Sequence, residues 1–353
     1  MPAPTVVFVN GVNRLPPEVL RQGVDSPLAS VRLRCLLPAA GLRRLGYHTT
    51  LVTLPELGDA TILAQLRDPA LRIVLGKLSP GTLAHHGDLC ATAFRALREL
   101  AHARPVHADV CDLLAPERGH TAPYIELATE RCHVVAPTRW LADHYARPGR
   151  PQPAVVEDPT ETPDAVPPRF APGPTLRLVW YGTWTQSSNR LVRGFLSEID
   201  DIDRPVSLTV VAQPEAAGFV GRLAEIALGA PAPRRIDHRP WSTEAVAAAT
   251  RAADIVLLPQ ETEHGWGRAK SHNRLVEAIR HGRLALASPI PAYAELADFA
   301  WVGERLADGL RWALAHPAAA AARVAAGQAE VARRFSLDAV ARAWARALDL
   351  PPV

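Results

Sequence analysis

Lysine is almost absent from this chain of 353 residues. Only Lys77 and Lys270 are lysines, although lysine and arginine together number 39. This imbalance, with abundant alanine and 33 prolines, is typical of a GC-rich coding bias as well as of selection. The formal net charge of +3 is small and is spread almost evenly over the two halves of the chain. Nucleic acid is therefore not an expected partner.

Long apolar runs are also missing. None approaches the roughly 18 residues that a membrane-spanning helix needs. The first residues pass from Met-Pro-Ala-Pro directly into an apolar strand at 5–9, without a basic segment before it. Neither a signal peptide nor a membrane span is therefore expected, and the sequence predicts a cytoplasmic protein.

Cysteine is scarce and dispersed. Cys35, Cys90, Cys111 and Cys132 form no Cys-x-x-Cys pair and no Cys–His spacing typical of a metal site. Reduced thiols used as small core residues are favoured over a metal site or a disulfide. No Asp-x-Asp follows an apolar strand end, so no metal and no other cofactor is expected.

Short apolar runs alternate with helix-period segments along the whole chain, which predicts a parallel α/β architecture. A long helix is expected over 30–45, ending at Gly46 as a C-cap. In the first half, strands are expected at 5–9, 49–53, 72–75, 106–110, 133–136 and 154–156. In the second half, they are expected at 176–182, 206–212, 235–238, 254–259 and 283–287.

A proline-rich polar stretch without periodicity separates the two series of strands. It predicts an N-terminal domain over 1–158, a linker over 159–174 and a C-terminal domain over 175–335. Alanine-rich helices follow from about residue 318 to the end of the chain.

One segment of the second half combines cations, an amide and a carboxylate near the start of a predicted helix. It begins Lys270-Ser-His-Asn273-Arg274-Leu-Val-Glu277 and continues through a glycine stop at Gly282 to Ser288. Backbone N–H groups and the dipole at a helix start favour an anion. The segment therefore predicts a phosphate and sugar site.

The same segment resembles the C-terminal signature of nucleotide-sugar glycosyltransferases with the GT-B fold, particularly bacterial enzymes of cell-surface polysaccharide synthesis. The matching residues are Lys270, Asn273, Arg274, Glu277, Gly282 and Ser288. Arg283 and Leu284 stand where the signature more often has a free position and a proline. In the commonest retaining branch, the glutamate that corresponds to Glu277 is the second of a Glu-x7-Glu motif. The first glutamate of that motif is replaced by Ala269 here, so the stereochemical outcome of the branch is not carried over.

The resemblance implies two Rossmann-like domains with a cleft between them. It also implies that a last helix, over 336–353, returns to the first domain. The C-terminal domain would bind the nucleotide-sugar donor and the N-terminal domain the acceptor. Ser30-Val-Arg32-Leu-Arg34 and the run from Asp109 to Leu141 resemble further stretches of such proteins, each weak alone and useful only in order.

Candidate donor-binding residues lie on the loop after one buried strand and at the start of the helix that follows Lys270. Lys270 is favoured as a ligand contact over a surface lysine. Glu277 is favoured as a ribose or sugar-hydroxyl ligand over an ion pair with Arg274. For Asn273 and Arg274 the two interpretations are balanced. Gly182 and Thr183 follow a buried strand, where backbone and hydroxyl groups can approach phosphates, although an ordinary βα loop explains them equally well.

Candidate bases lie in the first half. Asp109 and Asp112 end a strand on the side where α/β sheets bind ligands. An inverting transfer needs a carboxylate or histidine to accept the acceptor's proton. The competing interpretation of Asp112 is a cap of the following turn. Asn10-Gly11-Val-Asn13, Lys77, and the scattered histidines such as His85, His86 and His264 are weaker candidates, and the loop 261–267 is expected to shape the sugar pocket.

These patterns predict a cytoplasmic glycosyltransferase that moves a sugar from a nucleotide donor to a hydroxyl of a glycan or glycolipid. Glu277 would take part in catalysis if configuration is retained. Contact with the inner membrane stays open as an alternative location. Two other functions also stay open: a nucleotide-sugar epimerase or phosphorylase on the same fold, and a noncatalytic subunit that binds a glycan or a partner enzyme.

Overall fold

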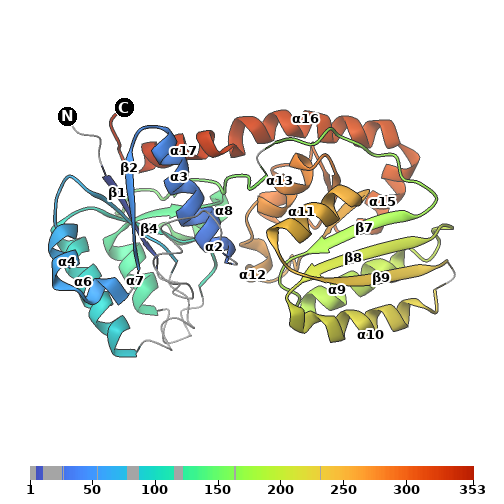
Figure 1. Ribbon diagram of the computed structural model, residues 1–353, viewed down its shortest axis with the longest axis horizontal. Coiled ribbons are helices and arrows are strands. Elements are labelled where there is room, and N and C mark those ends of the chain that lie inside the picture. The colour runs from blue at the N-terminus through green and yellow to red at the C-terminus, as the bar shows by residue number, and fades with distance from the viewer. Residues whose placement is uncertain are drawn as a thin grey trace. The chain divides into compact units, whose positions relative to one another are not determined.

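The computed structural model describes residues 5–10, 26, 28–53, 55–77, 87–114, 122–162, 164–230 and 232–353. The chain divides into two compact units, which are Met1–Pro159 with Arg334–Val353, and Thr160–Arg333 (Figure 1). Each unit is built on a parallel sheet of six strands. The predicted α/β class and its two Rossmann-like halves are confirmed. Among the described helices, none combines the length and the apolar character needed to cross a membrane.

The sheet of the first unit has the strand order β2-β1-β3-β4-β5-β6. The order reverses between β1 and β3, and parallel α/β sheets generally bind ligands at the carboxyl edge of such a reversal. Its strands are β1 (Thr5–Asn10), β2 (His48–Thr53), β3 (Arg72–Leu75), β4 (Val106–Asp109), β5 (His133–Ala136) and β6 (Ala154–Val155). All six were expected from the sequence.

Helices connect these strands. They are α2 (Ala29–Val31), η1 (Arg32–Leu36), α3 (Leu37–Arg44), η2 (Pro55–Gly58), α4 (Ala60–Leu66), α6 (Gly87–Ala103), α7 (Ala122–Arg131) and α8 (Arg139–Tyr145). The long helix expected over 30–45 is present as α2, η1 and α3, but η1 is a π-helical turn. Pro38 explains the widening, because its ring clashes with the carbonyl of residue i−4, here Arg34. Gly46 ends the helix at φ +97°, as expected of a C-cap glycine.

The last helix belongs to the first unit. α17 (Leu337–Ala347) packs on α3, where a Cβ added to Gly41 would lie 2.9 Å from the Ala341 Cβ. Trp344 is fully buried and meets the Phe8 ring edge to face, with the centroids 5.8 Å apart. The predicted return of the C-terminal helix to the first domain is confirmed.

The second sheet has the order β12-β11-β10-β7-β8-β9, which reverses between β7 and β10. This is the strand order of a dinucleotide-binding Rossmann sheet. Its strands are β7 (Leu176–Tyr181), β8 (Val206–Ala212), β9 (Arg234–Pro240), β10 (Ile255–Leu258), β11 (Leu284–Ala287) and β12 (Trp301–Val302). Five of them were predicted, whereas the two-residue β12 was missed because it is too short to show a period.

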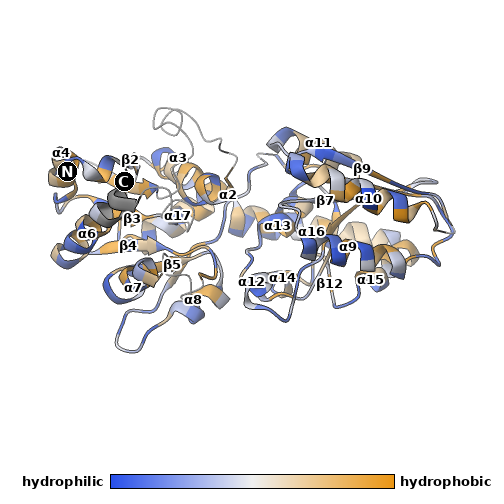
Figure 2. Cartoon of the chain, turned by 90° about the horizontal axis from the view of Figure 1, so that it is seen from below, coloured by the Kyte–Doolittle hydropathy of each residue, from blue (hydrophilic) through white to orange (hydrophobic). Residues whose placement is uncertain are grey.

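Helices cover both faces of this sheet. α9 and α10 lie on one face, and α11 and α13 lie on the other (Figure 1). Hydrophobic and hydrophilic residues alternate along these helices, as expected of helices that cover a sheet (Figure 2). The helices are α9 (Gln186–Glu198), η3 (Pro214–Ala216), α10 (Ala217–Ala227), α11 (Thr243–Ala252), α12 (Gly265–Arg268), α13 (Asn273–Arg280), α14 (Pro291–Ala294), α15 (Leu306–Ala315) and α16 (Pro317–Phe335).

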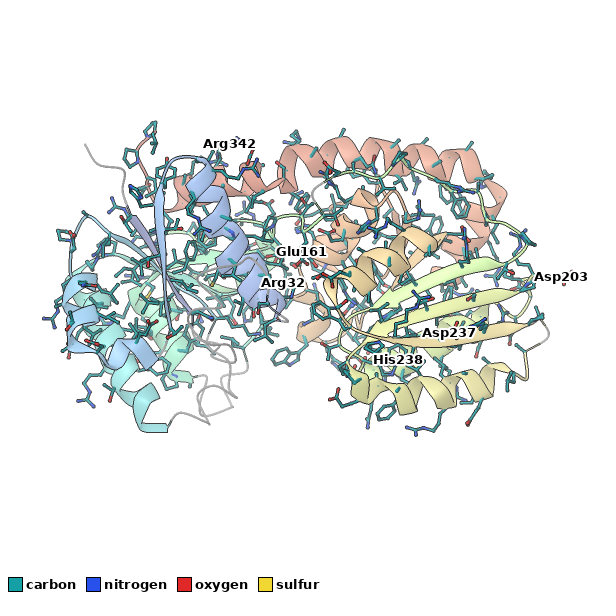
Figure 3. The ribbon with its side chains drawn as sticks, viewed as in Figure 1. Arg32, Glu161, Asp203, Asp237, His238 and Arg342 are labelled. Atoms are coloured by element: carbon teal, nitrogen blue, oxygen red, sulfur yellow. The ribbon has the colours of Figure 1, made fainter. Side chains whose placement is uncertain are left out.

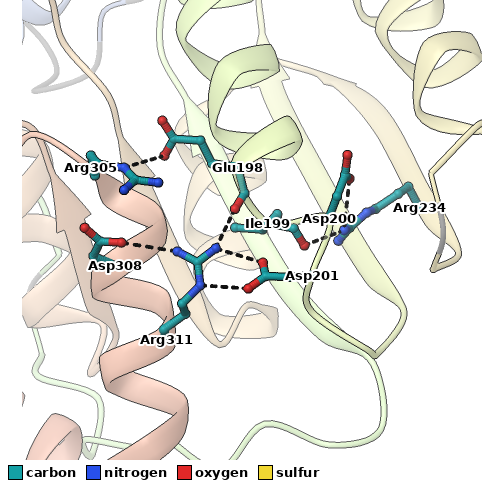
Figure 4. Close-up of polar contacts among 8 residues, drawn as sticks. All are labelled: Glu198, Ile199, Asp200, Asp201, Arg234, Arg305, Asp308 and Arg311. Atoms are coloured by element: carbon teal, nitrogen blue, oxygen red, sulfur yellow. Dashed lines mark hydrogen bonds and ion pairs between the residues drawn. The ribbon is translucent and has the colours of Figure 1, made fainter.

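An arginine network closes the amino edge of the second sheet (Figure 4). Arg311 of α15 donates to both oxygens of Asp201, at 2.8 and 3.0 Å, and to the Glu198 carbonyl at 2.7 Å. Arg234, at the start of β9, donates to the Ile199 carbonyl at 2.8 Å. The network ties the end of α9 to α15 and β9, at the edge of the sheet opposite to the carboxyl ends of its strands.

The proline-rich segment that leads into β7 belongs to the second unit and is hydrogen-bonded to the end of α13. Its backbone N–H groups at Val166 and Arg169 donate to the carbonyls of Arg280 and Gly282, at 2.9 and 3.1 Å. Gly282 has φ +69°, and a Cβ there would lie 2.5 Å from the Pro167 carbonyl oxygen. Only glycine allows the segment to lie this close to the end of α13.

Candidate functional site

The carboxyl edge of the second sheet, between β7 and β10, brings together the candidate donor-binding residues. β7 ends at Gly182, whose φ of +142° is open to glycine and strained for other residues. A Cβ at Gly182 would lie 3.3 Å from Nη1 of Arg274. The loop after β7 therefore passes directly over the start of α13, and Thr183 on this loop is exposed.

Reciprocal hydrogen bonds fix the start of α13 to the end of β7. The Tyr181 hydroxyl donates to the Arg274 carbonyl at 3.0 Å, and Arg274 Nη1 donates to the Tyr181 carbonyl at 3.2 Å. Burial raises the pKa of Tyr181 well above its usual value, so this hydroxyl stays a donor. The pairing places the first turn of α13 beside the loop that carries Gly182.

Lys270 and Asn273 flank the start of α13, and both are half-buried. The Nδ2 group of Asn273 is buried and has no hydrogen-bond partner among the described residues. A buried donor left without a partner costs roughly 1 to 3 kcal/mol, so a group of this kind commonly marks a ligand or water site.

A second helix start faces the same edge. α9 begins after Thr185, whose hydroxyl accepts from the Ser188 N–H at 3.1 Å. The Trp184 backbone is fixed on both sides by Gln213, which accepts from its N–H and donates to its carbonyl, each at 2.8 Å. The loop 182–185 is therefore held rigidly, with the positive ends of α9 and α13 on either side of it.

Glu261, on the loop that follows β10, connects this loop to α9. It accepts from the Ser187 hydroxyl at 2.6 Å and from Arg190 Nη2 at 2.5 Å, which ties the loop after β10 to the first turns of α9. Gly267 lies against it, since a Cβ there would be 1.8 Å from the Glu261 carbonyl oxygen. The loop 261–267 is thus folded tightly back on itself, while its Trp266 is 44% exposed.

Glu277 lies one helical turn after Arg274 and is 6% exposed. Its two carboxylate oxygens accept from the Glu161 backbone N–H and from the Thr162 hydroxyl, each at 2.6 Å. Thr162 also lies 3.0 Å from Nε2 of His281, and its carbonyl accepts from Nε of Arg280 at 3.2 Å. The end of the linker is therefore attached to the side of α13 (Figure 3 labels Glu161).

The buried surroundings shift the pKa values of this group in opposite directions. Burial raises the pKa of Glu277 to about 7, against the opposing hydrogen bonds from Thr162 and Glu161. Burial and three neighbouring arginines lower the pKa of His281 to about 4, so this imidazole is neutral near pH 7. Its Nδ1 has no partner among the described residues, which favours the tautomer with the proton on Nε2, pointing at Thr162.

Asp109, at the end of β4 in the first unit, is completely buried in an ion pair. Nη2 of Arg34 lies 2.6 Å from Asp109 Oδ1, and Nε of Arg34 donates to both oxygens at 3.1 Å. Nη1 of the same arginine reaches the Val156 carbonyl at 2.7 Å and Asp158 at 3.1 Å. Arg34 thus joins the π-helical turn to β4 and to the chain beyond β6.

Asp112 lies three residues further along and remains 21% exposed. It forms an ion pair with Lys77, the residue that follows β3, and Lys77 is 23% exposed. The Tyr145 hydroxyl donates to the Asp112 carbonyl at 3.1 Å and accepts from the Leu114 N–H at 2.9 Å. The carboxyl ends of β3 and β4 therefore carry a cation and a carboxylate that are both open to solvent.

The predicted site residues form two groups. Gly182, Thr183, Lys270, Asn273, Arg274 and Glu277 gather at one edge of the second unit, and Asp109 and Asp112 lie at the corresponding edge of the first. Gly11 and Asn13, and the pair His85 and His86, lie outside the described residues. Within the described ranges, no three His, Cys, Asp or Glu side chains are grouped as metal ligands would be.

Two residues with prominent contacts, Thr162 and Arg34, were not predicted as site residues, and Glu261 was expected only as part of the loop 261–267. Thr162 was assigned to a structureless linker, and nothing in its local pattern indicates a partner 115 residues away. Arg34 was noted only for its resemblance to a motif. Glu261 did carry a signal, because a carboxylate just after a buried strand lies at the edge where such sheets bind ligands.

No protein-family model and no curated protein matches the sequence. Among solved structures, Anabaena Alr3699/HepE in complex with UDP-glucose superposes with a TM-score of 0.64, at 14% identity, covering 98% of this chain and 99% of that chain. A glycosyltransferase from Rickettsia africae ESF-5 gives 0.67 at 12% identity, covering 98% of both chains. AviGT4, a glycosyltransferase involved in avilamycin A biosynthesis, gives 0.50 at 15% identity, covering 98% and 97%.

The chain has a glycosyltransferase fold. The agreement extends over nearly the whole length of both chains, so it includes both Rossmann-like units and the C-terminal return. The GT-B architecture expected from the resemblance is thereby confirmed.

Proposed function

We propose that this protein is a glycosyltransferase that takes a sugar from a nucleotide-sugar donor bound to the second unit. The observation that carries the proposal is the meeting of two helix starts, those of α9 and α13, with Lys270 and Arg274 at the point where the strand order reverses. A diphosphate fits such a place, because N–H groups, helix dipoles and cations all favour negative charge there. The UDP-glucose complex of HepE supports this choice of ligand class.

In this proposal each residue of the donor site has a distinct role. Gly182 and Thr183 offer backbone and hydroxyl donors to the phosphates, and Lys270 and Arg274 neutralise the charge that grows on the leaving diphosphate. Asn273 contributes the buried amide donor that has no partner among the described residues. Charge neutralisation by these groups supports a transfer that needs no metal ion or other cofactor.

We assign the acceptor to the first unit and the base for an inverting transfer to Asp112. Asp112 is partly exposed beside Lys77, whereas Asp109 is completely buried in an ion pair with Arg34. A general base must reach the hydroxyl whose proton it accepts, and only the first of these carboxylates is open to solvent. If the transfer retains configuration instead, Glu277 and its neighbours take the larger part.

The proposed acceptor, process and location follow from the resemblance of the C-terminal segment to the glycosyltransferase signature. A glycan or glycolipid hydroxyl is the proposed acceptor, in the assembly of a bacterial surface polysaccharide. The proposed location is the cytoplasm, with contact at the inner membrane as its variant. These assignments stand on Lys270, Asn273, Arg274 and Glu277 matching a signature of such enzymes.

A noncatalytic binding subunit is the second candidate. It is favoured by Ala269, which replaces the first glutamate of the Glu-x7-Glu motif, and by the attachment of Glu277 to the linker. Such a subunit would bind a nucleotide sugar or glycan without consuming it. An epimerase or phosphorylase on this fold would act on a nucleotide sugar without a separate hydroxyl acceptor.

A thermal-shift screen of the purified chain against UDP-, GDP-, CMP- and dTDP-sugars tests the donor assignment. One nucleotide class is expected to raise the unfolding temperature, because a ligand that binds only the folded state stabilises it by mass action. The nucleoside diphosphate alone is expected to give most of the shift. A flat response to every class, including the free diphosphates, would remove the basis of the proposal.

A further inference from the structure

Glu161 and Thr162, near the start of the linker, donate two hydrogen bonds to the carboxylate of Glu277, as the two hydroxyls of a sugar diol would. One oxygen accepts a backbone N–H and the other accepts a hydroxyl, both at 2.6 Å. Two neighbouring donors on two carboxylate oxygens are also what the adjacent hydroxyls of a ribose or hexose present. Both arrangements use the same two carboxylate oxygens of Glu277, so the linker and a bound sugar compete for them.

Glu277 lies where a bound donor would extend. It is on α13, one turn from Arg274, and Arg274 is bonded to the end of β7 beside Gly182. Phosphates held at the start of α13 would leave the attached sugar rings within reach of the next turn of the helix. Glu277 is only 6% exposed, so a ligand hydroxyl reaches it only after the linker hydroxyl has moved away.

We propose that Thr162 and Glu161 hold the place of two donor hydroxyls on Glu277, and that binding of the nucleotide sugar exchanges them and releases this end of the linker. The inference rests on the donor site proposed above and adds an intramolecular competitor to it.

The exchange is local and nearly balanced in energy. The two hydrogen bonds to a buried carboxylate are replaced one for one, so no carboxylate oxygen is left bare. The rest of the segment stays attached, because the Val166 and Arg169 N–H groups and Gln328 Nε2, which donates to the Val166 carbonyl at 2.6 Å, lie outside the exchanged pair. After release, Nε2 of His281 and Nε of Arg280 lose their contacts with Thr162, which sets a modest cost for opening.

Hydrogen exchange at the Glu161 amide reports the release directly. The probes are UDP-glucose, GDP-mannose, CMP-sialic acid and dTDP-glucose, each added to the full chain at saturating concentration. The probe that binds is expected to speed exchange of the Glu161 amide by about tenfold, the factor for roughly 1.4 kcal/mol of lost protection. The Val166 amide, which is bonded to Arg280, is expected to keep its rate and serves as the internal control.

Two variants at Thr162 test the competition by a second measurement. Thr162→Val keeps the shape and removes the hydroxyl, so it is expected to bind the same probe about three- to tenfold more tightly. Thr162→Ser keeps the hydroxyl and is expected to bind like the wild type. Lys270→Ala is expected to lose affinity for the probe while the Glu161 amide of the free protein stays protected.

The outcomes separate this inference from the proposed function. A probe that binds without changing exchange at Glu161, or a Thr162→Val variant with unchanged or weaker affinity, overturns the exchange and leaves the donor site standing. Failure of all four probes to bind the wild type and every variant overturns the donor site, and the exchange with it. Because the amide measurement uses the wild type, poor folding of a variant does not affect it.

Discussion

At the scale of single residues, Lys270 is the side chain on which the proposed donor site depends most. Lys270→Ala is expected to weaken nucleotide-sugar binding by about 1.5 to 3 kcal/mol, the usual range for a hydrogen bond to a charged group. Lys270→Arg should restore binding only in part, because a planar fork replaces a point charge. Isothermal titration measures both changes.

The matched control for this charge removal is Arg311→Ala. Arg311 belongs to the network at the opposite edge of the same sheet. This variant is expected to change stability slightly and donor affinity not at all. Equal affinity of the wild type and Lys270→Ala for the nucleotide sugar would show that Lys270 is a surface lysine with no part in donor binding.

Glu277 predicts a pH dependence of stability. Its pKa is raised to about 7 in the folded chain from an ordinary value of 4.5, so the native state binds the proton more tightly than the unfolded state does. Its contribution to the free energy of unfolding is therefore largest below pH 4.5, falls as the pH rises through 7, and is constant above that. The charged neighbours of the site, Glu161 and Arg280, and the neutral His281 do not reverse this sign.

The comparison of wild type with Glu277→Gln isolates this contribution. A glutamine amide can donate to Thr162 as a protonated carboxyl would, and it does not titrate. The unfolding temperature of Glu277→Gln relative to wild type is expected to rise between pH 5 and pH 8, whereas His281 contributes to both proteins. A difference that is constant over this range would show that Glu277 ionises as an ordinary carboxyl does.

Replacement of Asp109 and of Asp112 by asparagine is expected to have different effects on stability and turnover. Asp109→Asn leaves Arg34 buried with one counter-charge fewer, and breaking a buried pair costs about 3 to 5 kcal/mol. Asp112→Asn affects a partly exposed pair and should change stability by less than about 1 kcal/mol. If Asp112 is the base, its variant should instead lose about a hundredfold to ten-thousandfold in turnover with donor binding intact. Denaturant unfolding and turnover assays distinguish the two, and a fully active, inverting Asp112→Asn would defeat the assignment.

At the scale of elements, α17 provides the test of the C-terminal return. Trp344→Ala removes a fully buried ring that packs on Phe8, so it is expected to cost about 3 to 5 kcal/mol in the first unit. Trp266→Ala removes a ring that is 44% exposed and should fall within about 0.5 kcal/mol of wild type. Similar effects of the two variants on the free energy of unfolding would contradict the packing of α17.

The strands were predictable because each is a short buried apolar run between turn residues, and eleven of the twelve coincide with such runs. The π-helical turn was not, because it arises from Pro38 acting on the carbonyl of Arg34 inside a sequence that otherwise has a helical period. β12 was missed for a different reason, since two residues carry no periodicity.

The candidate site was predictable only where its residues are neighbours in sequence. Lys270, Asn273 and Arg274 lie together at the start of one helix, and the helix dipole alone indicates an anion there. The partners of Asp109 and Glu277 lie 75 and 115 or more residues away, so their burial and pairing depend on tertiary contacts that no local pattern encodes. The same contacts separate the completely buried Asp109 from the partly exposed Asp112.

At the scale of the whole molecule, two parallel sheets have different strand orders, and each order reverses at a point where such sheets generally bind ligands. The second unit concentrates helix starts, cations and a buried amide at its edge, which suits a diphosphate. The first unit presents a partly exposed carboxylate and lysine, which suits the handling of a proton. This division of charge is the physical basis of the proposed transfer from a donor on one unit to an acceptor on the other.

The release of free nucleotide from a nucleotide sugar shows whether this protein transfers the sugar. In the absence of acceptor, water can take the place of the acceptor hydroxyl, so slow hydrolysis by the wild type is expected. At donor concentrations below saturation, Lys270→Ala should slow it in proportion to the lost donor affinity, and Arg311→Ala should leave it unchanged. A wild-type protein that binds a nucleotide sugar tightly but releases no nucleotide, with or without glycan acceptors, would contradict the account and favour a noncatalytic binding subunit.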